Sequence, residues 1–193
     1  VLDKTKTAMG ARTLRTYIEQ PLIVKESILN RQDAIYELNQ SLIAREEIRE
    51  YLNPIYDLER LISKITYRTG NPRDLMAFKS SISMIPHIKY LLEPFKAKIL
   101  VDLHNNLDTL EDIYGLIESS IMEEPPVTIR EGGIIKKGFH EEVDKLREAK
   151  TEGKNWLAEL ETKERERTVI KGLKIKYNRV FGYFLEVTNS YKD

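Results

Sequence analysis

The stretch that decides the fold is Phe139-His-Glu-Glu-Val-Asp-Lys-Leu-Arg-Glu-Ala-Lys150, which continues through Glu166-Arg-Thr168 into Leu173-Lys-Ile-Lys-Tyr-Asn-Arg-Val-Phe-Gly-Tyr-Phe-Leu-Glu-Val187. The first part is highly charged and has the hydrophobic period of a helix, whereas the last part alternates as a strand does. We therefore interpret the stretch as a long helix that leads into a basic, aromatic hairpin.

The helical part carries apolar or small residues at alternating steps of three and four, the spacing of one helix face. The series is Phe139, Val143, Leu146, Ala149 or Lys150, Gly153, Trp156 with Leu157, and Leu160. About 30 residues at 1.5 Å each make a rod of roughly 45 Å, and Gly153 weakens it by only about 1 kcal/mol relative to Ala. Because this apolar seam is narrow and its surroundings are charged, we expect it to need a partner helix.

The hairpin is predicted to have one apolar and one basic face. Alternation places Leu173, Ile175 and Tyr177 on one side of the first strand. If the chain reverses near Arg179-Val-Phe181, residues Tyr183, Leu185 and Val187 join that apolar face. The other face carries Lys174, Lys176 and Asn178.

The basic residues of this region are concentrated between residues 163 and 179, against only Glu164 and Glu166. They are Lys163, Arg165, Arg167, Lys171, Lys174, Lys176 and Arg179. Such a cluster indicates contact with backbone phosphates, without the residue pattern that reads bases. The alternative is an ordinary solvated hairpin face.

The N-terminal part is predicted to be a compact body of helices joined by short connections. The expected helices span about 8–20, 25–40, 41–52, 56–68, 73–92 and 99–122. Thr7 is the expected N-cap of the first helix, and Pro86 should kink or restart the fifth. The second helix is expected to turn five apolar side chains inward, namely Ile28, Leu29, Ile35, Tyr36 and Leu38. After Pro126 the period changes, and residues 127–138 are expected to form two short strands around Gly132-Gly133.

The composition limits the possible functions. The 193 residues contain 31 Lys plus Arg and 31 Asp plus Glu, so any preference for a polyanion must come from a local patch. Cysteine is absent, which excludes disulfides and cysteine-ligated zinc. No apolar run approaches the ~18 residues of a membrane span, and the start lacks a signal-peptide pattern. Because the chain starts at Val1 and stops at Asp193 directly after a strand-like run, we interpret it as a piece of a longer protein.

Catalytic motifs are missing from the sequence. Gly153-Lys-Asn155 is the nearest approach to a phosphate-binding loop, but it lies inside the predicted charged helix. His87, His104 and His140 lie far apart without neighbouring ligands, and no serine has the Gly-x-Ser-x-Gly surroundings of a nucleophile. We therefore expect neither an enzyme nor a metal or cofactor site in this chain.

Four ordered motifs are similar to the MutS family of DNA mismatch-repair proteins. The first is Leu2-Asp-Lys-Thr-Lys-Thr-Ala-Met-Gly-Ala-Arg-Thr-Leu-Arg15 with Pro21-Leu22. The others are Asp57-Leu-Glu-Arg-Leu61 with Gly70-Asn-Pro-Arg-Asp-Leu75, then Ile134-Ile-Lys-Lys-Gly138 with Glu142-Val-Asp-Lys-Leu-Arg147, and finally Glu164-Arg-Glu-Arg-Thr168 with Leu173 to Tyr183 and Glu186-Val-Thr188. The resemblance covers essentially the whole chain.

The resemblance implies a mainly α fold, a helical lever or core bundle with one very long helix leading to a small antiparallel β hairpin. Residues 1–150 would be the core or lever domain, and residues 151–193 the incomplete N-terminal part of the clamp domain. Lys174 matches a position that resembles a clamp phosphate contact, and Lys176, Asn178 and Arg179 belong to the same ribbon. The triplets Phe139-His-Glu141 and Phe184-Leu-Glu186 spell the family's mismatch-reading motif, but in the wrong domain.

For the parent protein, the resemblance implies a bacterial, cytoplasmic and nucleoid-associated homodimer. Its partners would be the backbone of double-stranded DNA and other mismatch-repair proteins, with no membrane. ATP and magnesium would bind in a C-terminal domain outside this chain, and a returning helix outside it would cover the seam. An alternative remains open, in which the seam around Val143, Leu146, Leu157 and Leu160 recruits a protein and the lysines only increase solubility.

Overall fold

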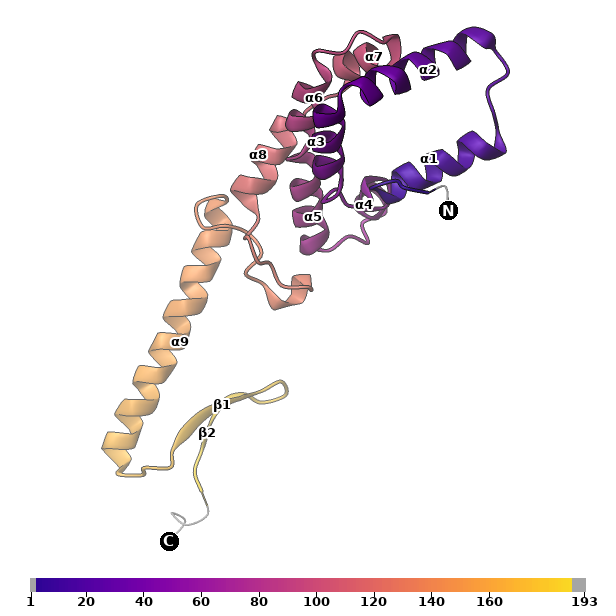
Figure 1. Ribbon diagram of the computed structural model, residues 1–193. Helices are drawn as coiled ribbons and strands as arrows, with labels where there is room; N and C mark the ends of the chain where they lie inside the picture. Colours follow the sequence, from indigo (N-terminus) through magenta and orange to yellow (C-terminus); the bar gives the residue numbers. More distant parts are fainter. Residues whose placement is uncertain (1–2, 189–193) are drawn as a thin grey trace. The chain divides into compact units, whose positions relative to one another are not determined.

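The computed structural model describes residues 3–188 of the chain (Figure 1). Its internal contacts divide the chain into two units, Val1–Lys136 and Lys137–Asp193, and each unit is described by itself. The long helix lies wholly in the second unit. The domain boundary predicted after residue 150 stays a prediction.

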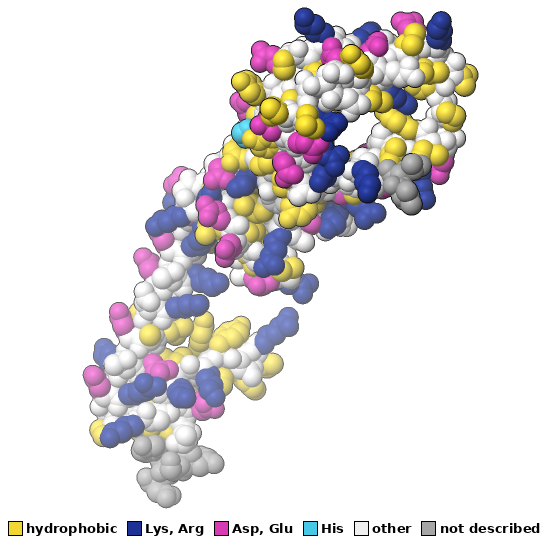
Figure 2. All heavy atoms as spheres, viewed as in Figure 1, with side chains coloured by type: hydrophobic (Ala, Val, Ile, Leu, Met, Phe, Trp, Pro, Cys, Tyr) yellow, Lys and Arg dark blue, Asp and Glu magenta, His cyan; other side chains and the backbone are white. Residues whose placement is uncertain are grey.

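The first unit is built from helices, as predicted for the N-terminal part. They are α1 (Ala8–Glu19), α2 (Lys25–Gln40), α3 (Leu42–Leu52), α4 (Leu58–Thr66), α5 (Pro72–Ile82), α6 (Ile85–Leu92), α7 (Lys98–Asn106) and α8 (Glu111–Ser120). Acidic and basic side chains are mixed over the visible surface (Figure 2), in keeping with the equal numbers of the two kinds. The mainly α fold class is confirmed.

Several predicted helix boundaries are confirmed. The Thr7 hydroxyl accepts the Gly10 N–H at 3.0 Å, which caps α1 as predicted. At α5, Asn71 and Asp74 form a capping box on either side of Pro72, whose missing N–H costs nothing in the first turn. The predicted restart near Pro86 is also confirmed, because α5 ends at Ile82 and α6 begins at Ile85.

The single helix expected over residues 99–122 is wrong, because two helices, α7 and α8, occupy this range. α7 ends at Asn106, Leu107 is extended with ψ 105°, and Leu110, directly before α8, has φ +53°. Within this break the Asp108 carboxylate accepts the Leu110 N–H at 2.9 Å, so a side chain satisfies a backbone donor that no helix satisfies. A short polar side chain that competes for backbone N–H groups is a known cause of such breaks.

The two-stranded ribbon expected over residues 127–138 is also wrong. Ile129–Glu131 form a 3-10 turn, η1, fixed by a capping box between Thr128 and Glu131. Ile135 instead makes an isolated antiparallel bridge with Ile121, just after α8. The residue that follows α8 pairs with this segment, and the other half of the expected ribbon does not. Periodicity alone cannot predict which of two segments a strand will pair with.

The inward face predicted for α2 is partly wrong. Leu29, Ile35 and Tyr36 are 46, 53 and 65% exposed, whereas Ala34 is buried. Ala34 belongs to a core cluster with Leu92, Phe95, Ala97 and Leu100, against which Leu38 packs. The buried stripe of α2 is therefore narrower than predicted.

The main core cluster joins four helices and the segment after α8. Its buried members are Leu61, Phe78, Ile82, Ile85, Ile117 and Ile121. Ser81 is fully buried beside them, and its hydroxyl is satisfied twice. It donates to the Ala77 carbonyl at 2.8 Å and accepts the Tyr56 N–H at 3.0 Å, which fixes the segment before α4.

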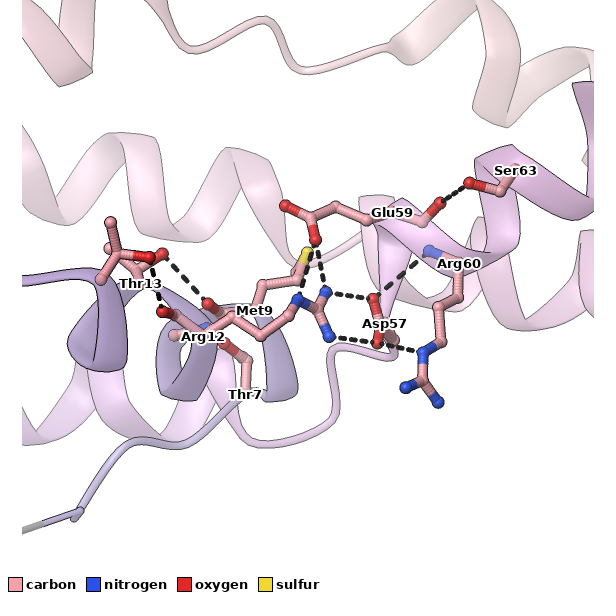
Figure 3. A network of polar contacts seen from close by, with 10 residues as sticks. Thr7, Met9, Arg12, Thr13, Asp57, Glu59, Arg60 and Ser63 are labelled. Atoms are coloured by element: carbon pink, nitrogen blue, oxygen red, sulfur yellow. Dashed lines mark hydrogen bonds and ion pairs between the residues drawn. The ribbon is translucent and has the colours of Figure 1, made fainter. Parts of the chain in front are cut away.

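An ionic network ties α1 to the start of α4 (Figure 3). Arg12 donates to both carboxylate oxygens of Asp57 at 2.8 Å and to Glu59 through Nε at 3.0 Å. Asp57 is also the N-cap of α4 and accepts the Arg60 N–H at 3.3 Å. The hydrogen bond from Arg12 is the main reason that the pKa of Asp57 falls to about 2.

The second unit contains the predicted long helix, α9 (Glu141–Thr168), and Gly153 does not interrupt it. The Asp144 carboxylate accepts the Gly138 N–H at 2.6 Å, which holds the chain ahead of the first turn. Leu146 and Trp156 are 71 and 61% exposed, and no second helix runs along the seam among residues 137–188. After α9 come β1 (Lys174–Asn178) and β2 (Gly182–Glu186).

Candidate nucleic-acid interface

The hairpin has the register that alternation predicts. Ile175 pairs with Leu185 and Tyr177 with Tyr183, so the apolar residues share one face. The two tyrosine rings lie 5.0 Å apart, centroid to centroid. Lys174 faces Glu186 and Lys176 faces Phe184, as pairs of the opposite face.

The turn lies where the sequence placed it, at residues 179–181. The Asn178 side-chain oxygen accepts the Val180 N–H at 2.8 Å, and Gly182 has φ +75°. Val180 and Phe181 are each 82% exposed at the tip. The tip is thus closed by a local side-chain hydrogen bond and by a glycine in a conformation that other residues disfavour.

The four predicted contact residues lie together, three on one face of β1 and Arg179 in the turn. Lys174, Lys176, Asn178 and Arg179 are all exposed. Lys176 forms an ion pair with Glu186 at 2.5 Å, whereas neither Lys174 nor Arg179 forms one within residues 3–188. These side chains can donate hydrogen bonds to a polyanion, although Glu186 already neutralises part of the charge of Lys176. That these residues bind DNA stays a prediction.

Two other cations counted in the basic region are used internally. Arg165 donates through Nε to the Leu173 carbonyl at 2.7 Å and pairs with Glu161. Arg167 pairs with Glu164, and this hydrogen bond raises the Arg167 pKa. The local positive charge is therefore smaller than the residue count suggests. Figure 2 still shows lysine and arginine side chains gathered around the hairpin and the adjoining end of α9.

The hairpin is anchored to α9 by residues that the sequence reasoning did not single out. Glu161 accepts the Ile175 N–H at 2.7 Å, while Arg165 donates to the Leu173 carbonyl. Between these bonds the Leu173 side chain is only 2% exposed. At the start of β1, Glu161 thus binds a backbone N–H and Arg165 binds a backbone carbonyl. The only signal in the sequence is their spacing of four on one helix face.

The three histidines have different neighbours. His87 stacks on Tyr51 with the ring centroids 4.7 Å apart, His104 lies next to Asn105, and His140 precedes α9. Among the described residues, no group of three or more His, Cys, Asp or Glu side chains could hold a metal ion. The same residues form no helix that is long and apolar enough to span a membrane.

Comparison with known proteins gives one consistent result. The family model of MutS domain III matches residues 1–189. The chain is 67% identical over 191 residues to the DNA mismatch repair protein MutS of Lachnoclostridium phytofermentans, covering 99% of the chain and 20% of that protein. It is 53% identical to that of Acetivibrio thermocellus and 54% identical to that of Ruminiclostridium cellulolyticum, covering 99% of the chain and 22% of each. The chain therefore spans about a fifth of the length of these curated relatives.

Proposed function

Because the chain belongs to the MutS family of DNA mismatch-repair proteins, as domain III, we propose that it is a lever and a sequence-independent clamp on the backbone of double-stranded DNA. The observation that carries this proposal is the set of exposed donors on the hairpin, Lys174, Lys176, Asn178 and Arg179, held at the end of an unbroken helix. In this role the chain catalyses no reaction itself.

The lever part of the proposal rests on the continuity of α9. Its 28 residues, at 1.5 Å each, span about 42 Å. Since Glu161 and Arg165 bond to the start of β1, the hairpin follows the end of the helix. A small rotation at the start of α9 would then displace the donors at the other end by a larger distance.

The clamp part rests on the chemistry of the exposed donors. Lysine and arginine release counterions from phosphates, and an amide can donate a neutral hydrogen bond. Contacts with phosphates carry no sequence information. Binding that follows from these residues would therefore depend on salt and not on sequence.

The remaining partners belong to the longer protein. We propose that it is a homodimer that works with other mismatch-repair proteins in the bacterial cytoplasm, near the nucleoid. ATP and magnesium would bind in an ATPase domain outside residues 1–193, and the lever would couple that domain to the DNA contact. Membership of the family does not favour the alternative of an interaction module that makes no DNA contact.

The clamp is tested by titrating salt against the duplex affinity of the full-length protein. If Lys174, Lys176 and Arg179 each meet a phosphate, they contribute about −2.7 to the slope of log K against log salt, at roughly −0.9 per phosphate. The triple alanine variant should lose that part of the slope on any duplex sequence. An unchanged slope would reject the clamp.

The lever is tested separately by interrupting α9. Ala158 is exposed in the middle of the helix, so Ala158→Pro breaks the rod without removing a charge. We expect nucleotide to stop altering the residence time on DNA, while Ala158→Ser retains the effect. Normal nucleotide dependence in the proline variant, with a kink verified by hydrogen exchange, would contradict the lever.

A further inference from the structure

The first unit has an apolar groove that the clamp and the lever do not use. It lies between the end of α4, the start of α5 and the segment around η1, with a volume of about 380 Å³. Ile65, Leu75, Ile129 and Ile134 line it, and Arg68 stands among them. Ile129 is 73% exposed and Ile65 is 40% exposed. This volume falls in the range of binding pockets.

Contacts on both sides fix the backbone of the segment that carries Ile129. Thr128 and Glu131 form the capping box of η1, with the Thr128 hydroxyl donating to the Glu131 carboxylate at 2.8 Å. Ile135 on the other side is fixed by its bridge to Ile121. An exposed apolar side chain on a fixed backbone loses less entropy on binding a partner than one on a mobile loop.

The charges around the groove favour an acidic occupant. Among the described residues that line the groove, Arg68 is the only charged one. Within residues 3–188, no ion pair involves Arg68, which is exposed. A cation with no ion pair in the described chain therefore borders an apolar groove, and a carboxylate is the natural partner for it.

Arg68 also occupies a backbone position that suits glycine. It has φ +55°, directly after α4, while the N–H groups of Thr69 and Gly70 both donate to the Lys64 carbonyl at 2.9 and 3.0 Å. Helices that end in this way usually carry glycine at the left-handed residue. Arginine at this position is less favourable for the backbone than glycine would be. We therefore infer that the arginine side chain has a function.

We propose that this groove binds a short segment of a partner protein that combines apolar and acidic residues. An apolar side chain of the partner lies between Ile65, Ile129 and Ile134, and a neighbouring carboxylate pairs with Arg68. The inference does not depend on the proposed DNA contact, because it uses none of the hairpin residues.

The test uses the full-length protein and a fluorescein-labelled peptide, Asp-Asp-Leu-Phe-Asp-Glu, in an anisotropy titration. We expect saturable binding that weakens with salt. Arg68→Gly should weaken it about ten-fold with no loss of thermal stability, because glycine suits this backbone. Ile129→Ser should weaken it similarly, whereas Arg15→Ala, which removes an exposed cation from α1, should leave it unchanged. Peptides with serine for Leu-Phe, or lysine for the acids, should not bind.

Three results would overturn the proposal, two from the titration and one from cross-linking. The first is the absence of saturable peptide binding, and the second is equal affinity in Arg68→Gly. The third comes from a benzophenone amino acid at position 129. A photo-cross-link to the peptide supports the proposal, whereas a cross-link only within the same chain or to a second copy means that the groove already has another occupant.

Discussion

Arg12 in α1 and Asp57 at the N-cap of α4 lie 45 residues apart in sequence and form a bidentate ion pair, with both nitrogen–oxygen distances at 2.8 Å. The Asp57 carboxylate therefore has two roles. It binds Arg12, and it caps α4 by accepting the Arg60 N–H. The pair holds the N-terminal helix against the body of the first unit. Its strength should depend on the charge of Asp57.

The first prediction concerns acid. Arg12 lowers the pKa of Asp57 from 3.8 to about 2 in the folded protein. Because the folded pKa is below the unfolded one, this stabilisation is fully present above about pH 4 and is lost as the pH falls through about 2. Melting temperatures of the wild type and Asp57→Asn should therefore differ at pH 5 and converge towards pH 2. A constant difference would show that the charge is irrelevant.

The second prediction concerns Lys174, which has no ion pair among the described residues. Lys174→Ala in the full-length protein should lower the salt slope of duplex binding by about 0.9, the loss of one phosphate contact. Lys98→Ala is the matched control, since Lys98 is an exposed lysine of α7 paired with Asp102 at 2.8 Å. It should leave the slope unchanged. Equal slopes in the two variants would show that Lys174 does not contact a phosphate.

The third prediction concerns Glu186, whose carboxylate pairs with Lys176 and whose backbone lies opposite Lys174. Glu186→Gln removes a negative charge from the basic face and keeps the side chain's shape. Duplex affinity should rise about two- to five-fold, within the range of a surface ion pair. A matched Glu159→Gln on α9 should have no effect. A fall in affinity in Glu186→Gln would mean that Lys176 needs its partner for orientation.

The fourth prediction separates positioning from contact. Glu161→Ala removes the acceptor of the Ile175 N–H, whereas Glu159→Ala removes the same charge from an exposed site on the same helix. We expect faster hydrogen exchange over 173–187 and several-fold weaker duplex binding only in Glu161→Ala, with the salt slope retained because every cation remains. A reduced slope would instead indicate that a phosphate contact had been lost.

The fifth prediction compares two glycines of the second unit. A methyl group at Gly153 would meet open space inside α9, so Gly153→Ala should stabilise the helix by about 1 kcal/mol. Gly182 has φ +75°, so Gly182→Ala should destabilise the hairpin by about 1–2 kcal/mol. Hydrogen exchange of each segment reports both effects. Slower exchange of the hairpin in Gly182→Ala would contradict the turn geometry.

The sequence by itself determined what depends on near neighbours. The continuity of α9, the two-faced hairpin, the Thr7 cap and the break before Pro86 are set by side-chain period and local backbone chemistry. Two predictions failed for different reasons. Asp108 accepts the Leu110 N–H within the break that divides the helix expected over 99–122, and Ile135 of the expected ribbon pairs with Ile121, 14 residues earlier.

Only the tertiary structure decided which charges remain available. Arg165 looks like a tip cation in sequence but points to the Leu173 carbonyl, and Lys176 is shared with Glu186. Likewise, Arg12 finds Asp57 only after two helices pack. A charged side chain binds whichever opposite charge or backbone group the fold brings within about 3 Å, and sequence spacing does not encode that distance between remote residues.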